Sequence, residues 1–110
     1  MAGILVTVLN VMETLRLKRP DDWHIHLRDD AYLTRTVKDA ARYFSRVLVM
    51  PNLVPPITDV SAAVAYQQRI LAQAPAGFQP LMTLYLTDAT DADTVVAAKQ
   101  SGIVEAFKLY

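Results

Sequence analysis

The sequence predicts an α/β fold in which strands and helices alternate and the strands form one parallel sheet. Short apolar runs, roughly 20–35 residues apart, alternate with segments in which apolar residues recur every three or four positions, as in amphipathic helices. One of these runs, residues 47–50 (VLVM), is apolar throughout, which is typical of a strand covered on both faces. In such folds the ligand sites lie at the carboxyl ends of the strands.

The amino-terminal part contributes extended segments. Residues 1–12 (MAGILVTVLNVM) are apolar and uncharged, so they predict a strand extension, with a translation start at Met12 as the alternative. This stretch lacks the basic segment of a secretory signal and is far shorter than the ~20 residues of a bilayer span. Leu15 and Leu17 alternate with charged residues, as in a half-buried strand, and residues 23–27 form the next extended run.

Two helices are predicted on either side of residues 47–50. The first follows Asp29 and Asp30, whose carboxylates can cap its amino terminus. Its apolar stripe consists of Leu33, Val37, Ala40, Ala41 and Phe44. Three prolines then leave a rigid loop over residues 51–57. The second helix opens at Thr58–Asp59 and carries Val60, Ala63, Val64, Gln67 and Leu71 along one side.

The last third of the chain repeats the alternation. Residues 81–86 form a strand after Pro80, and Asp91 caps a helix over residues 92–100. Gly102 lies where a left-handed residue ends many helices. Residues 103–110 begin a further strand.

Composition excludes several functional classes. Eleven Lys+Arg balance eleven Asp+Glu, whereas nucleic-acid-binding domains usually carry a basic excess. No segment combines clustered cations with an apolar face, as a membrane-surface helix does. The chain has no Cys, which excludes disulfides and thiolate metal sites and suits a reducing cytoplasm. We therefore expect neither nucleic acid nor a membrane as a partner.

The pattern His24-Ile25-His26 is the clearest candidate site. Side chains two apart on a strand lie on the same face, with Cα atoms about 6.6 Å apart. Both imidazoles could therefore bind one metal ion at about 2.0–2.1 Å. The chain has no other His. Arg28 is one step further along that face and could hold a carboxylate through two hydrogen bonds. The alternative is a pair of half-exposed His residues without a ligand.

Other candidates follow the later strands. Asn52 lies in the proline-rich loop and could direct its amide at a substrate, although Asn is also common in turns. Lys108 is a charged residue inside an apolar strand. Either its stem packs on the sheet while the ammonium reaches water, or it points inward with a shifted pKa or a modification. Thr87 and Asp88 also follow a strand.

Four blocks of sequence carry a family resemblance: residues 21–29 (DDWHIHLRD), 49–56 (VMPNLVPP), 81–88 (LMTLYLTD) and 108–110 (KLY). In this order they resemble the amino-terminal third of dihydroorotase, in its shorter bacterial and plant-type form within the amidohydrolase superfamily. The resemblance runs from about residue 15 to residue 110. Residues 13–110 would then be the incomplete amino-terminal part of a barrel domain, and residues 1–12 an extension outside it.

The resemblance implies a metal-dependent TIM-type (β/α)8 barrel, of which this chain supplies about three βα units and one further strand. It implies reversible cyclisation of N-carbamoyl-L-aspartate to L-dihydroorotate, in pyrimidine biosynthesis, by a cytoplasmic homodimer. His24 and His26 would bind Zn2+, and Lys108, carboxylated by CO2, would bridge two zinc ions. Arg28 and Asn52 would bind the substrate carboxylate. In the family the general acid/base and further His ligands come from later strands, so we expect the 110-residue chain alone to be inactive.

Two further hypotheses come from the same motifs. One is another cyclic-amide hydrolase, such as a hydantoinase or allantoinase, although Trp23 and the block at residues 51–56 favour dihydroorotase. The other is a small α/β binding domain without catalysis. One position departs from the family pattern, because Asp30 stands where Gly is common. Asp is tolerated there less easily than Gly if φ is positive.

Overall fold

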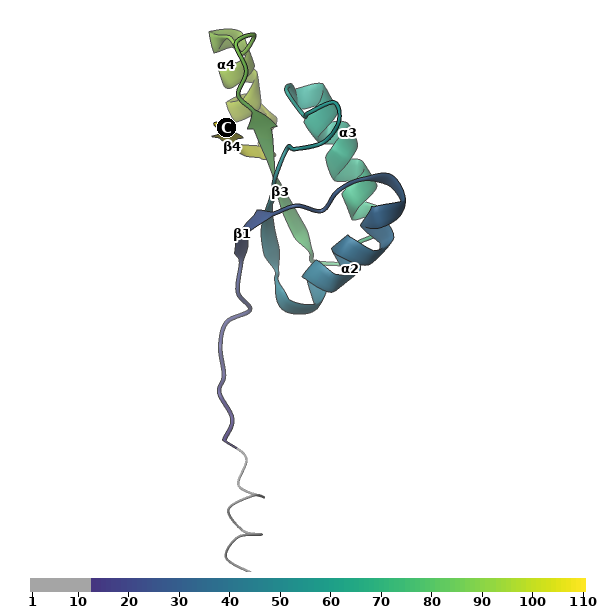
Figure 1. Ribbon diagram of the computed structural model, residues 1–110. Helices are drawn as coiled ribbons and strands as arrows, with labels where there is room; N and C mark the ends of the chain where they lie inside the picture. Colours follow the sequence, from purple (N-terminus) through teal and green to yellow (C-terminus); the bar gives the residue numbers. More distant parts are fainter. Residues whose placement is uncertain (1–12) are drawn as a thin grey trace, which may run out of the picture.

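The computed structural model describes residues 13–110, which form a four-stranded parallel sheet and three α-helices (Figure 1). In chain order the elements are β1 (Asp22–Ile25), the 3₁₀ turn η1 (Asp30–Tyr32), α2 (Leu33–Tyr43), β2 (Arg46–Val49), α3 (Val60–Leu71), β3 (Gln79–Tyr85), α4 (Ala92–Ser101) and β4 (Val104–Lys108). The predicted alternation of three βα units and a further strand is confirmed. The predicted strand extension at residues 1–12 lies outside the described residues.

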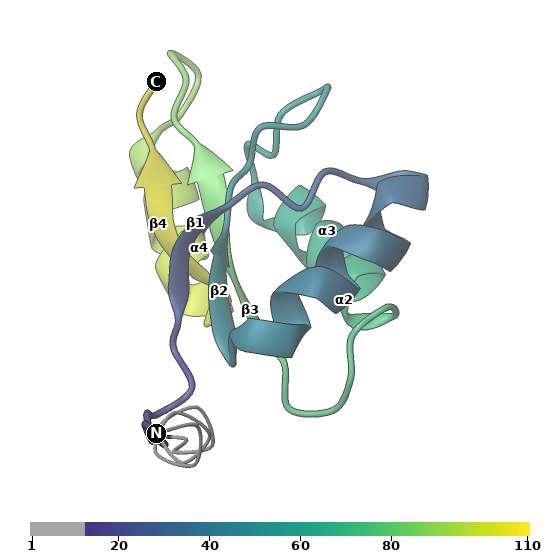
Figure 2. The ribbon, with the colours of Figure 1, turned by 60° about the horizontal axis from the view of Figure 1, so that its bottom comes forward.

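The sheet follows the order of the chain, β1-β2-β3-β4, and all neighbouring strands are parallel. Successive helices contact each other, α2 with α3 and α3 with α4, so they cover one face of the sheet (Figure 2). A doubly wound sheet would place helices on both faces. Sequential strand order with all helices outside is instead the wall of a (β/α)8 barrel, so the predicted partial barrel is confirmed.

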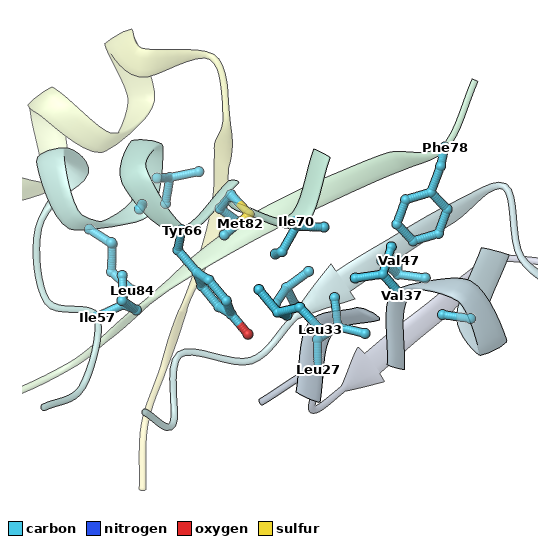
Figure 3. Close-up of a cluster of buried hydrophobic side chains, with 14 of the residues drawn as sticks. Leu27, Leu33, Val37, Val47, Ile57, Tyr66, Ile70, Phe78, Met82 and Leu84 are labelled. Atoms are coloured by element: carbon cyan, nitrogen blue, oxygen red, sulfur yellow. The ribbon is translucent and has the colours of Figure 1, made fainter. Parts of the chain in front are cut away.

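The hydrophobic core lies between the helices and the sheet (Figure 3). Alternate residues of the two central strands supply one side of it, with Val47, Val49, Met82 and Leu84 almost completely buried. The helices supply the other side through Leu33, Val37, Ala40, Ala63, Tyr66 and Ile70. On the opposite face Leu48 and Leu81 are only half-buried, because no helix covers that face within residues 13–110.

Three predicted helix boundaries are confirmed by their hydrogen bonds or backbone. The carboxylates of Asp59 and Asp91 accept the backbone N–H groups of Ala62 and Thr94, each at 2.8 Å, and so cap α3 and α4. Gly102 has a φ of 71° directly after α4. β3 begins at Gln79 and therefore includes Pro80, which the sequence placed just before the strand.

The strand predicted around Leu15 and Leu17 is wrong. These side chains are 80% and 76% exposed, and residues 13–21 have no strand beside them in the described part of the chain. Alternating hydrophobicity makes a strand only where a neighbouring strand takes up its backbone hydrogen bonds. The segment is held instead by Arg19, whose guanidinium donates to the backbone oxygens of Ala41 and Arg42 at 2.9 and 2.7 Å.

The buried face of α3 also differs from the prediction. Ala63 is buried as expected, but Leu71 and Val64 are 45% and 36% exposed, and Gln67 is only half-buried. Tyr66 and Ile70 fill the core instead, at 1% and 0% exposure. The helix carries apolar residues on more than one side, so spacing alone did not determine which side meets the sheet.

The predicted capping of the first helix by Asp29 and Asp30 is wrong. Asp29 makes no side-chain capping bond, because its carboxylate binds Arg69 of α3. Asp30 opens η1 with a φ of 50°, a conformation that glycine adopts more easily. A 3₁₀ turn therefore precedes α2, which begins at Leu33.

Candidate metal centre

The two imidazoles lie next to each other at the carboxyl end of β1. The Nε2 atoms of His24 and His26 are 3.2 Å apart, and the ring centroids are 5.2 Å apart. Two nitrogen ligands of one tetrahedral ion, each at 2.0–2.1 Å, are about 3.3 Å from each other. The observed separation therefore fits a metal ion shared through both Nε2 atoms, without rearrangement of the backbone.

Lys108 and Asn52, predicted from separate strands, are in contact. Lys108 is the last residue of β4, and Asn52 follows β2 by three positions. The Nζ atom of Lys108 donates to Oδ1 of Asn52 at 2.6 Å, and both side chains are half-buried. Because Oδ1 accepts from the lysine, the Nδ2 group of Asn52 keeps two N–H donors for a ligand.

The charged groups that act on His26 are all positive. Burial is the main cause of its lowered pKa, and the charges of Lys108, Arg28 and His24 lower the pKa further. In a flat sheet β1 and β4 would be about 14 Å apart. The Lys108 side chain reaches Asn52 after β2, the strand next to β1, which explains why its charge acts on His26. The lowered pKa favours the neutral form of His26, which is the form that binds a metal.

Arg28 is not on the strand. β1 ends at Ile25, and Arg28 has a φ of 60°, so the predicted placement one step further along the strand face is wrong. Its side chain is exposed. The ion pairs found within residues 13–110 involve the other arginines Arg35, Arg46 and Arg69. The Arg28 guanidinium thus has no carboxylate partner in that part of the chain, and it is available to an anionic ligand.

Some candidates do not join this centre. The Thr87 hydroxyl accepts from Ala89 N at 3.2 Å, and Thr87 N donates to Thr90 Oγ1 at 2.9 Å, so Thr87 stabilises its own turn. Across residues 13–110 no group of three or more His, Cys, Asp or Glu side chains could hold a metal ion. Within residues 13–110 the candidate centre therefore consists of the imidazole pair, and the Lys108 amine bonded to Asn52 is the further group that could join it.

Tyr66 and Arg69 contact the loop that contains Arg28 and Asp29, and the sequence did not predict either contact. The Tyr66 hydroxyl donates to the backbone oxygen of Arg28, and Arg69 binds the carboxylate of Asp29 through two hydrogen bonds of 2.9 Å. These partners are 38 and 40 residues apart in sequence. No local pattern could have identified them.

The Asp29–Arg69 pair predicts a pH dependence of stability. Burial acts to raise the pKa of Asp29, but the hydrogen bonds and the charge of Arg69 outweigh it, and the pKa lies below its usual value. The ionised carboxylate therefore stabilises the fold above its unfolded-state pKa of about 3.9, and this stabilisation is lost as the pH falls through the lower folded-state pKa. We expect Asp29→Asn to make the free energy of unfolding depend less on pH at acidic pH. Urea titration from pH 6 to pH 2 measures this dependence.

The control for this measurement is Asp39→Asn. Asp39 pairs with Arg35 on the surface of α2, where the two side chains are 50% and 83% exposed. Exposed pairs of this kind contribute little to stability. An equal pH dependence in Asp29→Asn and the unsubstituted chain would show that the Asp29–Arg69 pair does not link stability to pH.

Curated proteins with similar sequences were found for most of the chain. No family model matches the chain. It is 60% identical over 101 residues to the dihydroorotase of Shewanella oneidensis and 62% identical over 98 residues to that of Stutzerimonas stutzeri. The chain is homologous to dihydroorotases. The matches cover 90% and 87% of this chain but only 29% and 28% of those relatives, so the chain spans less than a third of their length.

Solved dihydroorotase structures share the fold. The Campylobacter jejuni dihydroorotase matches 86% of this chain with a TM-score of 0.78 and 38% identity, over 27% of its own chain. The Saccharomyces cerevisiae dihydroorotase, solved with 5-fluoroorotic acid, matches 82% with a TM-score of 0.72 and 30% identity, over 25% of its chain. The resemblance seen in the four sequence blocks is confirmed. None of the helices within residues 13–110 has the length and apolar character of a membrane span.

Proposed function

We propose that this chain forms part of a dihydroorotase active site and takes part in the reversible cyclisation of N-carbamoyl-L-aspartate to L-dihydroorotate. The observation that carries the proposal is the 3.2 Å separation of the two Nε2 atoms at a strand end. It occurs in a chain about 60% identical to dihydroorotases. These relatives favour dihydroorotase over a hydantoinase, an allantoinase or a non-catalytic binding domain.

His24 and His26 would hold a zinc ion through their Nε2 atoms. A bound zinc ion supplies a nucleophile from water at neutral pH and polarises a carbonyl group. Lys108, carboxylated by CO2, would become an anion and could help to hold two zinc ions. The charge distribution supports this role, because Lys108 and Arg28 both add positive charge near His26, and a carbamate would replace one of these cations with an anion.

Arg28 and Asn52 would bind the substrate carboxylate. The Arg28 guanidinium can donate two parallel hydrogen bonds to a carboxylate. The Nδ2 group of Asn52 can add another, because its Oδ1 already accepts from Lys108. The ligand of the yeast relative, 5-fluoroorotic acid, is itself a carboxylic acid, which supports a carboxylate site in this family. The homodimer and the cytoplasmic location stay predictions from the resemblance.

A chimera tests the proposed function. Residues 13–110 would replace the matching segment of the Shewanella oneidensis dihydroorotase, whose remaining chain is expected to supply the general acid/base and the other ligands. We expect the zinc-loaded chimera to convert dihydroorotate, but not hydantoin or allantoin, and the 110-residue chain alone to give no turnover. His24→Ala should abolish turnover and Arg28→Ala should raise KM, while Arg35→Ala on exposed α2 should change neither.

The proposed function has clear contradicting outcomes. A folded, zinc-containing chimera that gives no turnover would contradict the role of this segment. Turnover by the 110-residue chain would contradict the expected absence of its catalytic acid/base. Unchanged kinetics in both His24→Ala and Arg28→Ala would remove these residues from the site.

A further inference from the structure

The backbone of Arg28 has a conformation that its side chain does not favour. Its φ of 60° lies in the left-handed region. This conformation is unfavourable for residues other than Gly, Asn and Asp. Contacts elsewhere must therefore hold the residue in place.

Side chains from two helices supply these contacts. Thr36 of α2 donates its hydroxyl to the backbone oxygen of Leu27 at 2.7 Å. Tyr66 of α3 donates to the backbone oxygen of Arg28, and Arg69 of α3 binds the Asp29 carboxylate through two hydrogen bonds of 2.9 Å. Each of residues 27–29 is thus held by a hydrogen bond from a helix side chain, while the Arg28 side chain itself stays exposed.

Tyr66 can act as a rigid support because its ring belongs to the core. It is 1% exposed and lies among the buried side chains, with its hydroxyl at the end of the ring nearer Leu27 and Leu33 (Figure 3). Burial is the main cause that raises the pKa of this hydroxyl, so it remains a protonated donor at neutral pH. The Arg69 guanidinium lies 5.3 Å from the centre of the Tyr66 ring, and the two residues therefore support the loop together.

From this geometry we infer that Tyr66 and Arg69 are positioning residues that hold Arg28 in its left-handed conformation for binding the substrate carboxylate. The inference rests on the proposed function, because it assigns the purpose of the loop conformation to that ligand. Without the two supports residue 28 relaxes toward the extended region, and its guanidinium moves away from the histidines. Neither residue touches the substrate, so their effect passes through Arg28.

The test uses the chimera with Tyr66→Phe, which keeps the buried ring and removes only the hydroxyl. We expect KM for dihydroorotate to rise up to about tenfold, which corresponds to about 1.4 kcal/mol, the upper end of the usual contribution of one hydrogen bond. The kcat value should stay within about twofold, because the lost interaction binds ground state and transition state alike. Arg69→Lys, which loses the paired hydrogen bonds at the surface, should act in the same direction.

Matched controls and a double-mutant cycle separate positioning from stability. Tyr43→Phe and Arg35→Lys make the same changes on exposed parts of α2 and should leave KM unchanged. In the Arg28→Ala background, Tyr66→Phe should raise KM no further, because the residue through which it acts is gone. Additive effects, or a lower melting temperature with unchanged KM, would overturn the inference.

A second measurement needs no activity. In the 110-residue chain, the backbone chemical shifts of residue 28 should change from left-handed toward extended values in Tyr66→Phe and in Arg69→Lys. Unchanged shifts in both variants would overturn the inference. If Arg28→Ala leaves KM unchanged while these shifts move, the carboxylate role in the proposed function fails, whereas the structural support of residue 28 is retained.

Discussion

Replacing His24 or His26 by Ala is expected to lower the zinc affinity of the chain about 100-fold. Zinc binding by four-ligand peptide sites is worth about 10–16 kcal/mol, or about 3 kcal/mol for each ligand. A loss of that size corresponds to a factor of about 100 in the dissociation constant. The two Nε2 atoms already lie 3.2 Å apart, so each imidazole contributes a ligand without a cost of rearrangement. Competition with a chromophoric chelator at pH 7.5 measures the change.

Asp88→Ala is the control for this prediction. Asp88 also follows a strand and carries an oxygen ligand, but it is exposed in the turn after β3, and its charge is not among those that act on His26. It should leave zinc affinity unchanged. Wild-type affinity in both single His variants would show that the imidazole pair is not a ligand pair.

Ile70→Ala is expected to reduce the free energy of unfolding by about 2–5 kcal/mol, the usual cost of removing a large buried aliphatic side chain. Ile70 is completely buried between α3 and the sheet. Because folded proteins are stable by only about 5–15 kcal/mol, the variant should lose a large part of its stability. Urea unfolding followed by circular dichroism measures the difference.

The adjacent residue provides the comparison. Leu71 is 45% exposed, so Leu71→Ala should cost far less, about 0.5–1 kcal/mol. The periodicity of the sequence alone would place Leu71 on the buried side and would reverse the order of the two effects. A larger loss in Leu71→Ala than in Ile70→Ala would therefore show that α3 packs with the face predicted from sequence.

Much of the fold was predictable because its signals are local. Asp59 and Asp91 bond to backbone groups three residues away, and Gly102 ends α4 through its own φ. The imidazole pair was also predictable, because side chains two residues apart in an extended segment lie on the same face independently of the rest of the fold. The contact between Lys108 and Asn52 joins residues 56 positions apart, and it exists only because β2 and β4 run parallel in one sheet with β3 alone between them.

The sequence by itself determined the alternation of strands and helices, the caps of α3 and α4, the histidine pair and the dihydroorotase resemblance. Only the tertiary structure decided which face of α3 is buried, that residues 13–21 have no strand beside them, and that Asp29 binds Arg69 instead of capping a helix. The first set depends on interactions between near neighbours in the chain. The second depends on which distant segments come into contact, and packing energy chooses among several apolar faces that local spacing leaves equivalent.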